Sequence, residues 1–324
     1  MRIIGVGAAI VDRLMKIESD AELAAMELPK ASMTMIDDER FRAVNESTKA
    51  AQAVVVPGGA ACNTIRALAH LYPGTGFIGK IGTDATGEQY QRAIADLGVE
   101  TLLSHDATMP TGVATTFVST DGERTFATFL GASTQLCPAD LDALPLDGTD
   151  ILYLEGYLVY NTPLMEALAR VARERGIRMA FDMGSYNMVE QYRDYLTAYI
   201  KENVSILFAN EEEALALTGM TAIEALGAIG EMVDTVVVKT GAKGALLRDA
   251  AGSCSVPAHP VDRVQDTTGA GDFFAAGFFY GYAQGLTLER CGELGVLFAT
   301  EVIQVVGPNL HPSQWDAIKA RISQ

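Results

Sequence analysis

The segment with the clearest chemical content is residues 266–277, which read D-T-T-G-A-G-D-F-F-A-A-G. Residues 269–271 carry almost no side chain at the point where the chain enters an apolar helix. Backbone N–H groups at such a helix start can surround an anion, and the helix dipole strengthens their attraction. Asp272 would lie beside those donors, where it could take a proton from a hydroxyl that attacks a bound phosphoryl group. Residue types alone also fit a glycine-rich turn followed by an ordinary first-turn carboxylate.

Two signatures, far apart and in the right order, resemble those of the ribokinase-like (phosphofructokinase-B) kinase family. Residues 266–277 are similar to the second signature throughout. Residues 56–63, V-P-G-G-A-A-C-N, resemble the first signature, a G-G-x-x-x-N substrate loop, and residues 77–84 with Gly87 follow at the family's spacing. The resemblance covers nearly the whole chain. It implies an ATP-dependent kinase that phosphorylates a hydroxyl group and uses Mg²⁺.

The resemblance also implies roles around the transferred group. Asp272 would be the catalytic base, and the amides of Gly269, Ala270 and Gly271 would stabilise the charge that develops on the phosphoryl group. A carboxylate and an amide together offer acceptors and donors for a vicinal diol. The implied acceptor-binding residues are Asp12, Gly58, Gly59 and Asn63.

For the nucleotide, the resemblance points to two further motifs. Asn210 and Glu213 match an N-x-x-E motif and would organise hydrated Mg²⁺ near the phosphates. The same residues also fit an acidic helix start that the helix dipole favours. A K-T-G-x-x-G turn would lie along the phosphates and ribose of ATP, through Lys239, Thr240, Gly241 and Gly244.

Arg124 and Asp266 each have two interpretations. Arg124 aligns with an arginine that contacts phosphate in adenosine kinases, where a bidentate cation would be useful, but it also fits a solvated arginine in a hairpin. Asp266 occupies a position that in some relatives belongs to a potassium-binding loop, so K⁺ is a candidate further cofactor. Asp266 could equally fix the turn by hydrogen bonding.

The elements that must position these residues follow a strand–helix rhythm. Strands are predicted at 3–7, 76–78, 150–154, 178–182, 206–209 and 235–239. Several of them are continuous Val/Ile/Leu runs, which indicates burial on both faces. Helices are expected from Thr162-Pro163 to Gly176 and from about Thr86 to Leu97, where Gly98 follows. This alternation predicts an α/β fold, a ribokinase-like doubly wound and mostly parallel sheet flanked by helices, in one domain over residues 1–324.

Two regions break the rhythm, at about 13–56 and 110–130. They contain the strand-like runs 32–36, 113–118 and 124–130, and residues 120–123, T-D-G-E, read as a hairpin turn between the last two. The simple interpretation is a β-rich extension at the edge of the sheet. The functional one is a small β-rich lid over the carboxyl edge, where ligands of α/β sheets usually bind.

The acidic composition of the chain excludes some classes of binding partner. The chain of 324 residues has 41 acidic and 24 basic residues, a net charge of −17 that repels nucleic acid and anionic membranes. A phosphate site must therefore be built locally from amides, a few cations and metal. The four scattered cysteines favour neither zinc nor disulfides, and with no signal peptide expected the default is a reduced, cytoplasmic protein. A monomer or homodimer is expected.

Other nucleotide chemistries fit less well. Gly5 and Gly7 end the first predicted strand, but Ile10 stands where a dinucleotide-binding G-x-G-x-x-G motif needs its third glycine, and no Walker A motif is present. A non-catalytic sugar or nucleoside sensor would need neither the anion pocket nor Asp272. Among acceptors, resemblance to the adenosine-kinase branch favours a nucleoside, with Tyr157 stacking on the base. A kinase for ribose, fructose or a related carbohydrate is the alternative.

Overall fold

A computed structural model describes residues 1–49 and 52–322 of the chain. Its centre is a nine-stranded sheet that is parallel except for the hairpin at one edge, where β12, β13 and β14 run antiparallel. From that edge inward the strands are β14 (Gly252–Val256), β13 (Ala245–Asp249), β12 (Thr235–Lys239), β11 (Ile206–Asn210), β10 (Arg178–Asp182), β9 (Ile151–Glu155), β1 (Ile3–Val6), β5 (Thr75–Gly82) and β6 (Glu100–Asp106).

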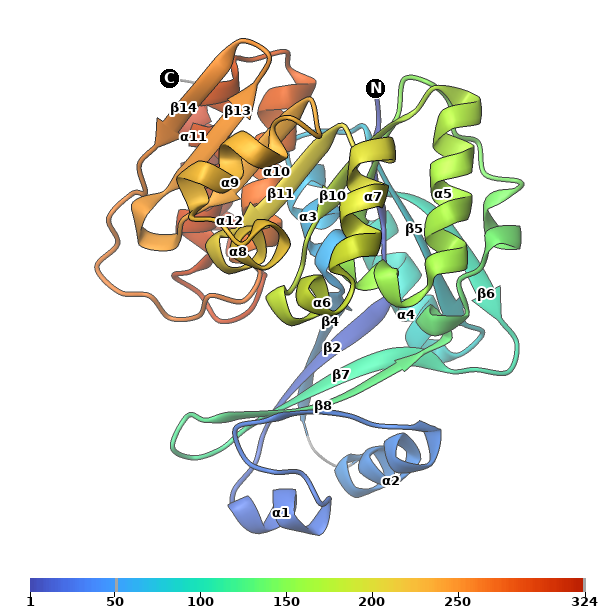
Figure 1. Ribbon diagram of the computed structural model, residues 1–324. Coiled ribbons are helices and arrows are strands. Elements are labelled where there is room, and N and C mark those ends of the chain that lie inside the picture. Colours follow the sequence, from blue (N-terminus) through green and yellow to red (C-terminus); the bar gives the residue numbers. More distant parts are fainter. Residues whose placement is uncertain (50–51, 323–324) are drawn as a thin grey trace.

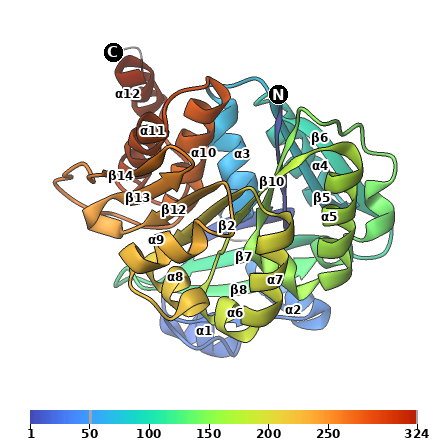
Figure 2. The same cartoon turned by 45° about the horizontal axis from the view of Figure 1, so that its top comes forward.

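Helices cover both faces of this sheet, as Figure 2 shows, and each face has its own apolar core. One face carries α5 (Thr162–Arg175), α6 (Tyr186–Gln191), α7 (Arg193–Asn203), α8 (Glu211–Thr218) and α9 (Ala222–Ile229). The other carries α3 (Ala60–Ala69), α4 (Ala85–Ala95), α10 (Ala270–Ala283), α11 (Leu288–Val302) and α12 (Pro312–Ile322). The short 3₁₀ helices in the described part of the chain are η1 (Ala132–Gln135), η2 (Pro138–Leu141), η3 (Gly156–Tyr160) and η4 (Gly241–Lys243).

These layers confirm the predicted doubly wound α/β class. β10 and β12 have the expected bounds, and α5 begins at Thr162 with a proline in its first turn and ends before the left-handed Gly176 (φ +68°). α4 is shorter than expected and stops at Ala95. Strands β6, β13 and β14 were not expected from the sequence, because they lie at the sheet edges, where continuous apolar runs are not required. Among the described residues, no helix combines the length and apolarity needed to cross a bilayer.

A second sheet of five strands projects from the carboxyl edge of the first, and it is drawn below it in Figure 1. Its order is β3 (Met33–Met35), β8 (Arg124–Gly131), β7 (Thr111–Val118), β2 (Ile10–Lys16) and β4 (Ala53–Gly58). Two helices, α1 (Asp20–Ala25) and α2 (Asp38–Thr48), lie on its far side. The predicted segment 13–56 is therefore not purely β, and its residues 50 and 51 lie outside the described residues. We call this unit the cap sheet; whether it moves as a lid remains a proposal.

The two faces of the cap sheet differ because its strands alternate. Register places Met15, Phe117 and Ala127 on the face that α1 and α2 cover, where they join a small apolar core. Asp12 and Arg124 lie on the opposite face. That open face looks toward the carboxyl edge of the large sheet, since the Arg124 side chain reaches the loop before α10.

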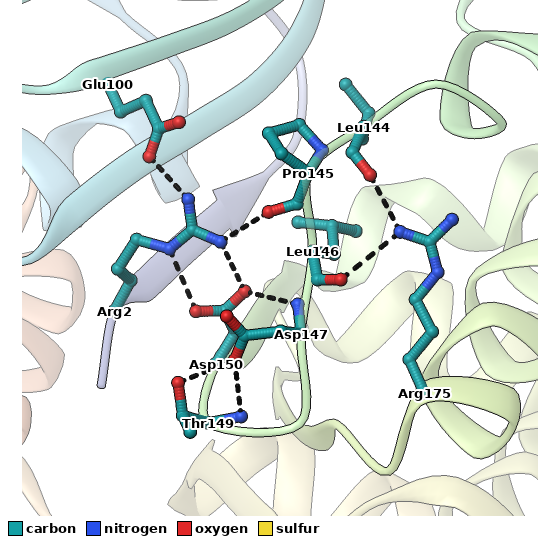
Figure 3. Close-up of polar contacts among 9 residues, drawn as sticks. All are labelled: Arg2, Glu100, Leu144, Pro145, Leu146, Asp147, Thr149, Asp150 and Arg175. Atoms are coloured by element: carbon teal, nitrogen blue, oxygen red, sulfur yellow. Dashed lines mark hydrogen bonds and ion pairs between the residues drawn. The ribbon is translucent and has the colours of Figure 1, made fainter.

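The amino edge of the large sheet is closed by ion pairs, which Figure 3 shows in detail. Arg2, just before β1, donates to both carboxylate oxygens of Asp150, at 2.9 and 2.6 Å, and to Glu100 at 2.7 Å. Its Nη2 also reaches the Pro145 carbonyl at 2.6 Å. The Asp150 side chain is fully buried. Arg2 thus joins the starts of three strands, β1, β6 and β9.

Candidate active site

The candidate site lies at the carboxyl edge, where four neighbouring parallel strands end in polar residues. Strands β9, β10, β11 and β12 end at Glu155, Asp182, Asn210 and Lys239. A cavity of about 400 Å³ contacts all four residues and Asp272. Ligands of open α/β sheets bind outside this edge of the strands, so the cavity has the expected position for a substrate site.

The start of α10 forms one wall of this cavity. Gly269 precedes the helix with φ +79°, a left-handed conformation that favours glycine, and a Cβ here would press on Pro308 at 2.7 Å. The N–H of Ala270 donates to the Thr267 carbonyl at 3.1 Å. The next N–H groups, at positions 271–272, belong to the first helical turn, whose donors have no partner within a helix. The anion pocket of Gly269, Ala270 and Gly271 amides stays a prediction, and the Ala270 N–H already donates within the turn.

Asp272 faces the acceptor side of the cavity. Its carboxylate accepts a 3.0 Å hydrogen bond from Asn63 Nδ2, which joins two residues 209 positions apart. Burial raises the pKa of Asp272 to about 7; Asn63 and Lys239 oppose that rise, and Asp182 and Glu155 add to it. A carboxylate with such a pKa is matched to proton transfer near neutral pH.

Lys239 is the cation at the centre of the site. Its Nζ lies 2.8 Å from Asp182, and it would lie 3.2 Å from a Cβ on Gly271. Burial opposes the charged form of the lysine, but the neighbouring carboxylates, Asp182 first, raise its pKa above the ordinary value. Lys239 therefore stays charged beside the anion pocket.

Asn210 and Glu213 hold each other at the start of α8. The Glu213 N–H donates to Asn210 Oδ1, and the Asn210 N–H donates to Glu213 Oε2, both at 2.8 Å. This reciprocal pair is a capping box, so the helix-start interpretation describes the contacts. Glu213 is nonetheless buried, and burial, which Lys239 opposes and Asp182 reinforces, raises its pKa to about 7. A role in holding Mg²⁺ stays a prediction.

The acceptor-side residues gather where the cap sheet meets the large sheet. The Asp12 carboxylate packs against Gly58, and burial, opposed by Arg66, raises its pKa to about 6. Gly59 has φ +96°, and a Cβ there would collide with the Ala8 carbonyl. Asn63 follows on α3. The structure thus brings all four predicted acceptor residues to one corner.

Tyr157 lies on η3 at the rim of the same cavity. Its side chain is half exposed. Its stacking on a base stays a prediction.

Glu155 and Asp182 were not expected as site residues. Glu155 accepts the N–H groups of Ala8 (2.8 Å) and Ala61 (3.0 Å), which places it between the approach to the cap sheet and α3. Burial, which these two bonds oppose and Asp182 reinforces, raises its pKa to about 7. One sequence signal could have found both acids, because each is the last residue of a buried parallel strand.

A second cavity, of about 710 Å³, lies beside the first and shares Lys239, Gly241 and residues 270–271 with it. Its other walls are mainly apolar and include Val261, Phe274 and Ile303. The predicted K-T-G-x-x-G motif forms a tight turn on its rim, because Thr240 N–H donates to the Gly244 carbonyl at 2.8 Å. Such an apolar pocket next to an anion pocket suits the base of a nucleotide.

Arg124 of the cap sheet and Asp266 in the loop before α10 form an ion pair, with Nη1 2.8 Å from Oδ2. Asp266 also accepts from the N–H and hydroxyl of Thr268, at 3.0 and 2.7 Å, and from the N–H of Gly307 at 2.8 Å. Asp266 therefore fixes the turn before α10, one of its two expected roles. Its potassium role and the phosphate role of Arg124 remain predictions.

Charge in the site is unbalanced. Asp182, Glu155, Glu213 and Asp272 surround one lysine, and three of these carboxyls have pKa values raised by burial. Among residues 1–49 and 52–322, no group of three or more His, Cys, Asp or Glu side chains is arranged to hold a metal ion directly. Magnesium usually binds through one or two carboxylates, several waters and substrate phosphates, so a Mg²⁺ site at these acids stays a prediction.

Comparison with known proteins identifies relatives over most of the chain. The family model described as pfkB family carbohydrate kinase matches residues 28–315. The aminoimidazole riboside kinase of Salmonella typhimurium is 33% identical over 69% of this chain and 73% of its own length.

Two solved structures are similar over the full length. A probable sugar kinase from Rhizobium etli has 34% identity and a TM-score of 0.84. The match covers 99% of this chain and 98% of the Rhizobium etli chain. The adenosine kinase of Sinorhizobium meliloti has 31% identity and the same TM-score, and covers 100% of this chain and 99% of its own.

Proposed function

The chain belongs to the pfkB family of carbohydrate kinases, and from that premise we propose that it transfers the γ-phosphoryl group of ATP to the 5′-hydroxyl of a nucleoside. Its family makes it a phosphotransferase that acts on an alcohol group. Adenosine is the first acceptor to test. The proposal concerns which alcohol is used, and how the residues at the carboxyl edge act on it.

The open face of the cap sheet is the observation that carries the nucleoside proposal. Register places apolar residues around Asp12 on this face, in rows that cross all five strands. They include Leu14, Val56, Ala114, Phe126 and Met35. A flat heterocyclic base can bury its faces on such a surface, while the ribose diol bonds to Asp12 at the hinge. Tyr157, across the cavity, offers an aromatic partner for the same base.

A sugar phosphate would need cations where this face has few. Phosphate groups are typically held by arginine forks or clustered lysines. Arg124 reaches the site from this face, but it is a single guanidinium that already gives one N–H group to Asp266. The similarity to a riboside kinase and an adenosine kinase supports the same choice, whereas the similarity to a probable sugar kinase keeps an unphosphorylated sugar as the second candidate.

In the proposed reaction Asp272 removes the proton of the acceptor hydroxyl. The oxygen forms a bond to the γ-phosphorus as the bond to the β,γ-bridging oxygen breaks, and ADP leaves. Asn63 holds the Asp272 carboxylate through its Nδ2, which leaves Oδ1 for a substrate hydroxyl. The N–H groups at the start of α10 and the Lys239 ammonium face the charge that moves across the phosphoryl group.

Mg²⁺ would neutralise and orient the phosphates when it is bound. The residues placed to hold its waters are Asn210, Glu213 and Asp182, on the side of the cavity opposite the acceptor. Binding of a cation there would also lower the pKa of the surrounding carboxyls, because an opposite charge favours their ionised form. Asp272 would then be deprotonated, as a base must be.

A panel of acceptors tests the proposal. With saturating MgATP, kcat/KM is measured for adenosine, guanosine, inosine and cytidine, beside ribose, fructose and fructose phosphates. We expect a nucleoside to lead. If a free sugar exceeded every nucleoside by more than about tenfold, a difference of about 1.4 kcal/mol in transition-state binding, the nucleoside proposal would be wrong and the kinase assignment would stand.

A further inference from the structure

The Arg124–Asp266 pair connects the two parts between which the acceptor would bind. Arg124 is the first residue of β8 and lies opposite Val118 in the β7–β8 hairpin. Asp266 lies 142 positions later, on the segment that leads into Gly269. The side chains are 25% and 8% exposed, so the pair is largely shielded from water. Solvent therefore screens it less than the exposed pairs of the same cap sheet.

Asp266 is held by contacts on both oxygens. Oδ1 accepts hydrogen bonds from the backbone N–H and the hydroxyl of Thr268. Oδ2 accepts hydrogen bonds from the Gly307 N–H and the Arg124 guanidinium. Burial opposes the charged form of this acid, but Arg124 first and then the other donors lower its pKa to about 2. Its ionised form is thus fixed, and its orientation depends on Arg124 as well as on the turn.

The loop after α11 connects Asp266 to α10, the helix that carries Asp272. The N–H groups of Gln265 and Asp266 both donate to the Ile303 carbonyl, at 2.8 and 3.3 Å. Pro308, in the same loop, packs against Gly269 at the start of α10. A change in the orientation of Asp266 would therefore reach the turn whose N–H groups form the anion pocket.

The loop is also tied to the acceptor side. Asn309 Oδ1 accepts from Arg66 at 2.7 Å, and Arg66 in turn donates to the Pro57 carbonyl at 2.7 Å. Pro57 belongs to β4, next to the substrate loop at Gly58. The loop at 303–309 thus contacts the turn before α10 on one side of the site and Arg66, which holds β4, on the other.

From these contacts we propose that Arg124 is a positioning residue that transmits the position of the cap sheet, through Asp266, to the anion-binding turn before α10. Its consequence for catalysis rests on the proposed kinase reaction: an acceptor that draws the cap sheet onto the site also aligns the phosphoryl pocket. A guanidinium has five N–H donors, so the pair with Asp266 is compatible with a phosphate contact by the same arginine.

The test combines hydrogen exchange with kinetics in Arg124→Met, Arg124→Lys, Asp266→Asn and the double variant Arg124→Met/Asp266→Asn. The control is Lys30→Met, which removes cap-sheet ion pairs to Asp20 (2.8 Å) and Asp121 (2.5 Å), both outside residues 264–272. We expect Arg124→Met to speed amide exchange in residues 264–272 as well as in 111–131. The control should leave 264–272 unchanged.

In the kinetics we expect Arg124→Met to lower kcat roughly 5- to 150-fold, the usual range for coupled sites, with a smaller change in the KM of the acceptor. Arg124→Lys should recover part of that loss, and the double variant should be no slower than the slower single variant. Unchanged exchange in 264–272, or losses that multiply in the double variant, would overturn the proposal. The exchange experiment needs no turnover, so it tests the link between Arg124 and the turn even in an inactive protein. If the protein phosphorylated nothing in the acceptor panel, the proposed function would be refuted, and the exchange result alone would decide on the role of Arg124.

Potassium gives a further readout, since a cation at Asp266 would compete with Arg124 for Oδ2. We expect replacing Na⁺ by K⁺ to affect the wild type little and to stimulate Arg124→Met. Equal stimulation of both proteins would contradict the assignment of Oδ2 to Arg124.

Discussion

Buried acids at the two edges of the large sheet have different kinds of partner. Asp150 and Glu155 flank one strand, β9, and both are nearly inaccessible to water. At the amino edge Asp150 has a bidentate partner in Arg2. At the carboxyl edge Glu155 is held only by neutral N–H groups and lies near Asp182, so its pKa rises to about 7. Asp150 is thus paired with a cation at one edge, whereas Glu155 at the other edge accepts backbone N–H groups and is available to protons.

The largest effect is expected at the carboxyl edge, from Asp272→Asn. Loss of a general base lowers kcat by roughly 10²–10⁴, while the free energy of unfolding should stay equal or rise, because a buried charge is removed. Steady-state rates and urea unfolding measure the two quantities. Turnover within about tenfold of the wild type would remove Asp272 from the role of base.

At the amino edge the effects should be reversed. Arg2→Met leaves Asp150 buried without its partner and should cost about 3–5 kcal/mol of stability, with kcat of the folded protein unchanged. The double variant Arg2→Met/Asp150→Asn should recover part of that loss. Arg92→Met, which breaks an exposed pair with Glu88, is the control and should change stability by less than about 0.5 kcal/mol. If Arg2→Met lowered stability no more than Arg92→Met does, the proposed difference between the two edges of the sheet would be wrong.

Glu155→Gln sharpens the comparison through pH. The folded pKa, about 7, lies above the ordinary value of 4.5, so the folded state binds more protons between these values and stability falls as pH rises through that window. Glu155 alone contributes on the order of 3 kcal/mol to this fall. Glutamine resembles the protonated acid, so the variant should lose less stability between pH 5 and pH 8, measured by urea unfolding. Identical pH dependence in the two proteins would show that Glu155 titrates normally.

The smallest effect is expected for Glu213→Gln, which should raise the Mg²⁺ concentration for half-maximal rate roughly 10- to 100-fold. Acceptor binding without ATP should hardly change. Glu212→Gln, at the exposed neighbouring position, is the matched control. If the two variants gave the same magnesium titration as the wild type, Glu213 would act only as the cap of α8.

The difference between the edges also explains what the sequence could predict. Strands such as 178–182 and 235–239 were recognisable because burial on both faces leaves a local apolar run. Asp272 and Asn63 were found because family signatures mark them. Arg2–Asp150 and Arg124–Asp266 join residues 148 and 142 positions apart, and no local pattern encodes such pairings. Glu155 and Asp182 were missed because an acid after an apolar run also looks like the start of a loop.

The cap sheet was only partly predictable for the same reason. Its strand β2 pairs with β4 from the same segment and with β7 from a distant one, and β4 contains Pro57. Alternating strands with a proline give a weak signal beside the long apolar runs of the large sheet. Helices α1 and α2 lie on the outer face of the cap sheet and bury few residues, so their apolar periodicity is also weak.

The place of β1 has a consequence for synthesis of the chain. β1 precedes β9 in the chain by more than a hundred residues, yet it lies inside the large sheet between β5 and β9, and its pairing with β9 joins residues 3–6 to residues 151–154. At about 5–20 residues per second, an apolar strand waits roughly 7–30 s on the ribosome for that neighbour. During this time its open edge can pair with other chains, so expression at a lower temperature or with a nascent-chain chaperone should raise the yield of folded protein.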